Sequence, residues 1–206
     1  MLNPTDLQRH TLRFYGELIA RRPTYGGRLI FTCGDACSAT GLPAAVSIAG
    51  GTTFALDPDA ATVKSVFRSG GIDFVVNTLD EAIRVLKNEV RQRKPLSVAL
   101  IAPLQASLDE IAERGLQPDL DIRAFDVGFL TPWLAARSWS EVAVPTASIR
   151  TLDAHLLELF PPDDTARRRW IQRIAHYQRP APGQPRLLWL TAAEEAQLGR
   201  SPMSQS

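Results

Sequence analysis

The chain has 206 residues, of which 45% are hydrophobic and 22% charged, enough apolar material to bury the core of one or two domains. Its 23 basic and 22 acidic residues nearly cancel, so we expect neither nucleic acid nor a membrane as partner. Two cysteines exclude a disulfide scaffold, and neither a secretory signal nor an apolar run near the ~20 residues that span a bilayer is visible. These features predict a cytoplasmic protein.

The first segment is predicted to be an amphipathic helix. Its sequence, TDLQRHTLRFYGELIARRP, places Leu7, Phe14 and Leu18 on one face, with Thr5 or Asp6 as the cap. We expect residues 1–26 to form a helix that packs on the domain that follows.

Residues 27–126 alternate short apolar runs with amphipathic segments. Five runs have the length of buried strands: Leu29–Phe31, Thr53–Leu56, Ile72–Val76, Leu96–Ile101 and Leu120–Ile122. A capping box at Thr78–Glu81 opens one helix between them, and Gly115 is a left-handed stop for another. Strands that alternate with helices predict an α/β, Rossmann-like domain with a mainly parallel five-stranded sheet and flanking helices.

Residues 127–206 are richer in tryptophan and proline. Helical patterns at 151–160 and 163–178 precede a proline-rich turn and one further apolar run, RLLWL. We therefore expect a helical extension with one short strand that packs on the domain. The run Arg167-Arg168-Arg169 could clamp a phosphate, but at the edge of an amphipathic helix we interpret it as a solvated face.

The cysteines and histidines do not form a metal-binding or redox pattern. Cys33 and Cys37 are spaced C-x-x-x-C, whereas a redox pair needs C-x-x-C, and a zinc site needs about four ligands. The other possible ligands, His10, His155 and His176, are scattered singly. We expect no metal, interpret Cys33 as a small buried hydrophobe and the histidines as helix-face residues, and assign no catalytic residue.

The order strand, polar loop, helix, strand leaves a nucleotide site open. Asp57 stands 23 residues after Gly34, where a Rossmann fold places the acid that binds a ribose. The loop GDACSATG, however, is neither G-x-G-x-x-G nor a P-loop, and Asp57 could instead cap the next helix. The candidate cofactor-binding residues are Gly34, Ser38, Thr40 and Asp57.

Several stretches share a pattern with a known family. They are GRLIFTCGDACSATGLPAAVSIAGGTTFALD, DFVVNTLDEAIRVLKNEVRQRKPLSVAL, LDEIAERGLQPDL and, later, ELFPPDDTARRRWIQRIAHYQRPAPGQPRLLWL. The first three resemble the central NAD-binding Rossmann domain of urocanase (urocanate hydratase), a lyase of histidine degradation, and the fourth resembles a later stretch of that family. The resemblance implies a homodimer in which oxidised NAD forms an adduct with the urocanate imidazole and activates it for addition of water.

The loops depart from the family pattern while the scaffold keeps it. Where the family has a loop resembling G-L-G-G-M-G-G-A-Q-P, residues 34–43 keep only the first glycine and the proline. The family's ribose-binding glutamate falls on Asp57 and a nearby arginine on Thr62. The family's G-N-A-A and D-Q-T-S-A-H segments fall on residues 102–105 and 123–128 without matching them. The segment between Gly128 and Leu159 is far shorter than in a urocanase, where this region carries the active-site cysteine.

These departures predict a non-catalytic binding or regulatory module with a degenerate NAD site. We expect no tightly bound cofactor, since NAD is implied by the family resemblance alone. The partner, a small molecule or a protein, is not identified by the sequence. Two alternatives stay open: an NAD-dependent urocanate hydratase, and a structural or interaction protein without a small-molecule site.

Overall fold

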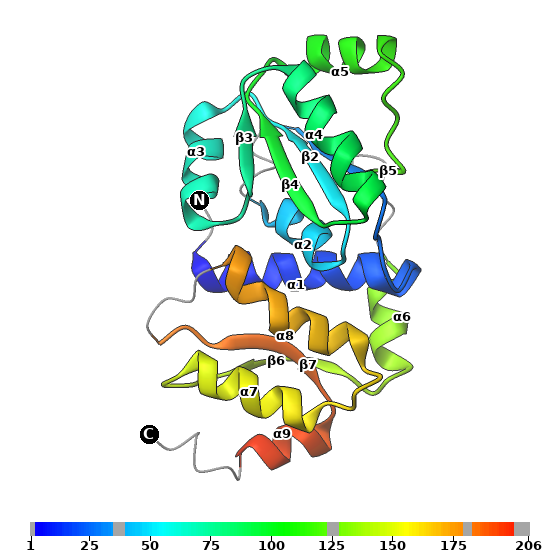
Figure 1. Cartoon of the computed structure of the whole chain (residues 1–206). Helices are drawn as coiled ribbons and strands as arrows, with labels where there is room; N and C mark the ends of the chain where they lie inside the picture. Colours follow the sequence, from blue (N-terminus) through cyan, green and yellow to red (C-terminus); the bar gives the residue numbers. More distant parts are fainter. Residues whose placement is uncertain (1–2, 35–39, 123–127, 179–182, 200–206) are drawn as a thin grey trace.

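The computed structural model describes residues 3–34, 40–122, 128–178 and 183–199 (Figure 1). Its larger sheet has five strands in the order β3-β4-β2-β1-β5, and every neighbouring pair is parallel. The strands are β1 (Leu29–Cys33), β2 (Thr52–Leu56), β3 (Phe74–Val76), β4 (Leu96–Leu100) and β5 (Leu120–Asp121). Each strand lies within or overlaps a predicted apolar run, so the predicted Rossmann-like α/β fold is confirmed.

Helices cover both faces of this sheet. On one face, α4 (Leu79–Gln92) and α5 (Leu104–Glu113) pack against Phe31 and Phe54, which point to the same side. On the other face, α2 (Leu42–Ile48) covers Ile30 and α3 (Ala60–Ser69) covers Ala55. Because side chains alternate along a strand, a sheet buried on both faces needs apolar residues at nearly every position, as β1 and β2 have.

Two predicted helix signals are confirmed. The Thr78 hydroxyl accepts a hydrogen bond from the Glu81 N–H (3.2 Å) at the start of α4, and the Glu81 carboxylate accepts one from the Asn77 N–H (3.2 Å). Gly115 ends the turn after α5 with a φ of +67°.

The N-terminal helix α1 (Pro4–Arg21) lies against α2, but its cap and its buried face differ from the prediction. Its cap is Asn3, whose side chain accepts a hydrogen bond from the Asp6 N–H. Its buried face is centred on Leu12, Tyr15 and Leu18, whereas the predicted Leu7 and Phe14 are only partly buried. The apolar residues of the sequence fit both faces, and burial of small and polar side chains against α2 selected between them.

The rest of the described chain builds a second, antiparallel sheet. Strand β6 (Ser140–Val144) pairs with β7 (Arg186–Leu190), and α1 and α8 (Thr165–Tyr177) lie between the two sheets (Figure 1). The remaining helices are α6 (Leu130–Ala135), α7 (Ile149–Leu159) and α9 (Ala192–Gly199). Only β7 was expected. Strand β6 escaped prediction because it is an edge strand with exposed and charged positions rather than a continuous apolar run.

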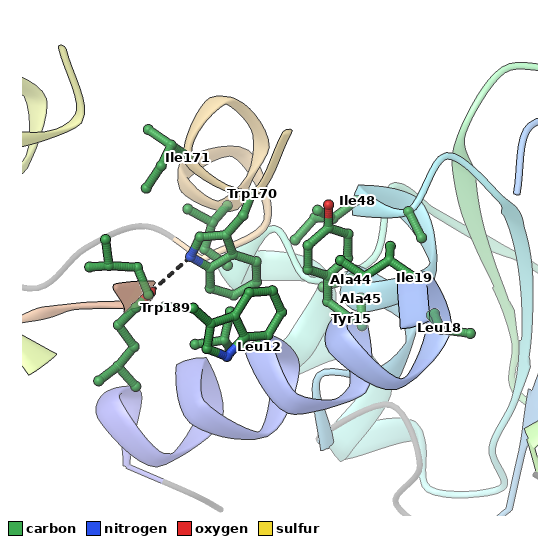
Figure 2. Packing of buried hydrophobic residues seen from close by; sticks show 14 of the residues in the cluster. Leu12, Tyr15, Leu18, Ile19, Ala44, Ala45, Ile48, Trp170, Ile171 and Trp189 are labelled. Carbon is green, nitrogen blue, oxygen red and sulfur yellow. Dashed lines mark hydrogen bonds between the residues drawn. The ribbon is translucent and has the colours of Figure 1, made fainter. Parts of the chain in front are cut away.

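An aromatic cluster joins this second sheet to α1. Figure 2 shows Leu12 and Tyr15 on α1 pointing towards Trp170 and Trp189. The Tyr15 ring stacks on both tryptophans, with ring centroids 5.8 and 6.1 Å apart. Burial raises the pKa of Tyr15, whose hydroxyl donates to the Ala166 carbonyl (2.7 Å). The cluster therefore covers the apolar residues that neither terminal segment could bury alone.

The arginine run of α8 is structural, so its interpretation as a solvated face is wrong. Arg167 is 4% exposed and pairs with Asp164 and with Glu194. The Arg168 guanidinium donates to the carbonyls of Leu157 and Phe160. Arg169 likewise donates to the carbonyls of residues 23 and 49. A guanidinium carries five donors in a planar fork, which makes it suited to binding carbonyls at the ends of neighbouring segments.

Candidate functional site

The carboxyl ends of the parallel strands form the edge where such a sheet binds ligands. Gly34 follows β1 and Asp57 follows β2, the neighbouring strand. The Gly34 N–H donates to the Leu56 carbonyl (3.1 Å), and the Asp57 N–H donates to the Leu100 carbonyl (3.3 Å). The structure thus places these two candidates side by side, at adjacent strand ends. Thr40 lies in the turn before α2, and Ser38 lies outside the described residues.

Asp57 is the most fully buried of the candidates, with an exposed fraction of 0%. Its Oδ1 atom accepts a hydrogen bond from the Asp59 N–H (2.9 Å), which folds the chain back between β2 and α3. The alternative that Asp57 itself caps α3 is wrong, because the cap is Asp59, which accepts from the N–H groups of Ala61 and Thr62. As placed, Asp57 offers no surface to a ribose hydroxyl.

Thr62, where the resembled family has an arginine, belongs to the same helix cap. Its hydroxyl donates to Asp59 Oδ2 at 2.5 Å. This hydrogen bond, together with those from the Thr62 and Ala61 N–H groups, lowers the pKa of Asp59. The position therefore stabilises the start of α3 and carries no cation towards the strand ends.

The first turn of α2 is covered by α1. Gly41, the residue before α2, faces Thr11 and Leu7 on α1 so closely that no side chain fits there. Pro43, in the first turn, has no N–H to donate. The backbone donors that a Rossmann fold directs at a pyrophosphate are therefore reduced at this helix start.

The ends of β4 and β5 lead into segments without catalytic side chains among the described residues. Pro103 precedes α5 and gives it no side-chain cap. After β5, residues 123–127 lie outside the described part of the chain. The chain then returns to α1, where the Glu17 carboxylate accepts hydrogen bonds from the N–H groups of Gly128 and Phe129, both at 3.0 Å.

The cysteine and histidine interpretations can be checked where the chain is described. Cys33 is 4% exposed within the core under α4, which confirms it as a small buried hydrophobe, whereas Cys37 lies outside the described residues. His10, His155 and His176 lie on α1, α7 and α8, as helix-face residues. Within the described ranges, no three histidine, cysteine or acidic side chains gather as metal ligands. In the same ranges, no helix has the length and apolar character needed to cross a bilayer.

Three hollows on the described surface lie away from Gly34 and Asp57. One of about 500 Å³ lies between α1, α6 and β6, and one of about 460 Å³ lies beside Trp133 and Trp139. The third, of about 240 Å³, is lined by three arginines at the amino ends of β1 and β5. Sequence reasoning did not find these arginines; the nearby pairs RR at 21–22 and GGR at 26–28 were the available signal.

The parallel sheet, its strand order and its acid after the second strand define an α/β protein with a Rossmann-like domain. Comparison with protein families gives one match, to the urocanase Rossmann-like domain, over residues 11–122. This range is just over half of the chain, so the chain belongs to the urocanase family. The match begins inside α1 and ends just after β5; the later stretch of resemblance, residues 158–190, lies outside it.

Proposed function

We propose that this urocanase-family chain is a non-catalytic binding or regulatory module whose NAD site is degenerate. The observation that carries the proposal is the burial of Asp57, which has no exposed surface and already accepts a backbone hydrogen bond. Membership of the family implies NAD binding by resemblance only. The proposal therefore concerns what this chain's own residues can still do at the strand ends.

The ribose contact is weakened at two positions. Asp57 would have to leave its hydrogen bond with the Asp59 N–H and reach the surface before it could bind a ribose hydroxyl. Thr62 cannot replace an arginine, because its hydroxyl is committed to the cap of α3. A ribose hydrogen bond worth about 1–3 kcal/mol would then be offset by the loss of a native one.

The phosphate contact is weakened by the loop sequence. Asp35, Ala36, Cys37 and Ala39 stand where the family has a glycine-rich loop, so Cβ atoms replace the bare backbone that phosphate oxygens approach. Asp35 also adds a negative charge. At ~4 Å from a phosphate and an effective dielectric near 20, this repulsion is about 4 kcal/mol per charge pair, which exceeds the ribose term.

The chemical step lacks its residues. No cysteine follows Cys37 in the sequence, and the three histidines lie on three separate helices. Proton transfer needs an acid or base within about 3 Å of the reacting group, or one water away. Without such a set aimed at one place, bound NAD would still leave urocanate unreacted.

Calorimetric titration with NAD and an absorbance assay for urocanate test the proposal together. We expect no micromolar binding and no turnover above a heat-killed sample, with Asp57→Ala indistinguishable from the unaltered chain in both. Micromolar binding that Asp57→Ala abolishes, or any turnover, would instead favour the NAD-dependent hydratase.

A second measurement separates a binding module from a structural protein. The purified chain is denatured, and its supernatant is analysed by absorbance and mass spectrometry. A released small molecule in stoichiometric amount supports the binding module, whereas a clean supernatant and no ligand-induced shift in melting temperature favour a structural or interaction role.

Self-association and compartment are proposed from the family resemblance. We propose a cytoplasmic homodimer, since the described Cys33 is a free thiol and the resembled family is dimeric. Light scattering at several concentrations tests this part: a mass of one chain throughout the range would exclude the dimer.

A further inference from the structure

Three arginine side chains line a hollow at the amino-terminal edge of the five-stranded sheet. Arg21 and Arg22 end α1, and Arg28 immediately precedes β1. The other lining residues are Tyr25, Asp119 and Leu120, and the volume is about 240 Å³. In Figure 1 the hollow lies where the chain leaves α1 and turns into β1, at the opposite edge of the sheet from Gly34 and Asp57.

The positive charge of this hollow is not balanced. Its single carboxylate, Asp119, pairs through Oδ1 with the Arg28 guanidinium (2.5 Å) and accepts the Leu29 N–H through Oδ2 (2.9 Å). Both oxygens are therefore already bonded. Among the described residues, Arg22 has no carboxylate within ion-pair distance. The lining thus carries three guanidinium groups against one carboxylate.

The Arg21 guanidinium is held in place without being neutralised. It lies 4.3 Å from the centroid of the Phe129 ring, a cation–π contact that orients the group and leaves its charge intact. Burial raises the pKa of Tyr25, while the charges of Arg21 and Arg22 act in the opposite direction. Both arginines therefore act on the same phenol at the wall of the hollow.

A fourth arginine approaches the rim through an uncommon backbone conformation. Arg93, after the last turn of α4, has a φ of +56°, where a residue with a side chain is disfavoured by roughly 1–2 kcal/mol. Its Cγ lies 3.2 Å from the position that a Cβ on Gly27 would take, one residue before Arg28. Strain of this kind persists where the surrounding structure uses the residue.

We propose that this hollow binds a phosphate dianion, either inorganic phosphate or the phosphate group of a small ester. Guanidinium groups match phosphate oxygens with paired N–H donors, and several arginines converging on a concave surface focus the field on an anion. The volume accommodates a phosphate group but not a nucleotide of the size of NAD. The inference is independent of the proposed function, because it uses the other edge of the sheet.

Calorimetric titration with inorganic phosphate, at constant ionic strength and pH 8, tests the proposal. We expect one site per chain, weakened about tenfold by Arg22→Gln and less by Arg22→Lys, which keeps the charge but not the fork. Arg68→Gln removes an exposed arginine at the end of α3 and serves as the matched control, with unchanged affinity. Equal weakening by Arg22→Gln and Arg68→Gln would mean general charge attraction and would overturn the site, as would no binding to the unaltered chain.

Two further ligands identify the source of the phosphate. Glycerol phosphate that binds at the same site, in competition with inorganic phosphate, points to an ester; weaker binding of the ester points to the free ion. Arg93→Gln provides a second variant whose folding can be checked by its melting temperature, and it should weaken phosphate in the same direction. Unchanged binding in both Arg22→Gln and Arg93→Gln would refute the proposal.

Discussion

The Thr11 hydroxyl on α1 stands directly against Gly41 at the start of α2, in the space that a side chain on Gly41 would need. This hydroxyl cannot move aside freely, because it donates to the Leu7 carbonyl (2.8 Å) and accepts from the Gln178 side chain (2.5 Å). Gln178 ends α8, so one small group of atoms joins α1, α2 and α8. The loop after β1 therefore returns to the sheet under a lid made by both terminal segments.

Gly41→Ala should destabilise the fold for two separate reasons. The φ of +79° disfavours a residue with a Cβ, and that Cβ would also overlap Thr11. We expect the free energy of unfolding to fall by about 2–4 kcal/mol, measured by urea denaturation.

Gly115→Ala is the control for the backbone part of this cost. Gly115 also has a positive φ, +67°, but nothing lies within 4 Å of its Cβ position. It should lose only about 1–2 kcal/mol. Equal losses in the two variants would show that the contact between Thr11 and Gly41 is not tight in solution.

The two tryptophans at the centre of the aromatic cluster differ in one hydrogen bond. Trp170 Nε1 donates to the Leu187 carbonyl at 2.8 Å, drawn as the dashed line in Figure 2, whereas Trp189 Nε1 is buried without a hydrogen-bond partner. Trp170→Phe should therefore cost about 1–2 kcal/mol more free energy of unfolding than Trp189→Phe, because both lose ring volume but only one loses a bond. Thermal or urea unfolding of the pair measures the difference, and a larger cost for Trp189→Phe would contradict it.

The Rossmann-like half of the fold was predictable because its signals are local. Each strand is a short apolar run, and α4 carries its cap in four consecutive residues, Thr78–Glu81. Strand β6 and the burial of Arg167 were not predictable, because both depend on partners far along the chain: β7 for the strand, and Glu194 for the arginine. A charged residue on a helix looks the same in sequence whether its partner is water or a distant carboxylate.

The candidate site shows the same division. Topology alone places Gly34 and Asp57 at adjacent strand ends, since parallel strands end at a common edge. The burial of Asp57 depends on the turn to Asp59 and on packing that no spacing rule encodes. The arginine hollow is assembled from the end of α1 and the starts of β1 and β5, which are separated by about ninety residues in sequence.

Glu17 should control the stability of the chain where it returns to α1 after β5. Its two carboxylate oxygens each accept one N–H, from Gly128 and from Phe129. Glu17→Ala should speed amide hydrogen exchange at both positions by about tenfold, and Glu17→Gln should do so mainly at one, because an amide has a single acceptor oxygen. Glu158→Gln, an exposed change on α7, is the control. Unchanged exchange in Glu17→Ala would mean that these bonds are not maintained in solution.

The ion pair between Arg167 and Glu194 should make stability depend on pH in the acid range. Burial acts to raise the pKa of Glu194, but hydrogen bonds from Arg167 and Thr191 outweigh it and hold that pKa below its usual 4.5. A carboxyl whose folded pKa is lowered stabilises the fold fully above its unfolded pKa, and this contribution is lost as the pH falls through the folded value. The unfolding free energy should therefore decline below about pH 4.5 in part through Glu194.

Glu194→Gln should remove that part of the pH dependence. At pH 7 it should cost about 2–3 kcal/mol, because the Arg167 guanidinium is only 5% exposed and keeps Asp164 as its one remaining carboxylate. Glu195→Gln, on the exposed neighbouring position of α9, should leave both the stability and its slope with pH unchanged. Urea unfolding at intervals between pH 3 and pH 7 measures all three chains. A Glu194→Gln curve parallel to that of the unaltered chain would mean that the ionised Glu194 does not stabilise the fold, and that Arg167 is held by Asp164 and its ring contacts alone.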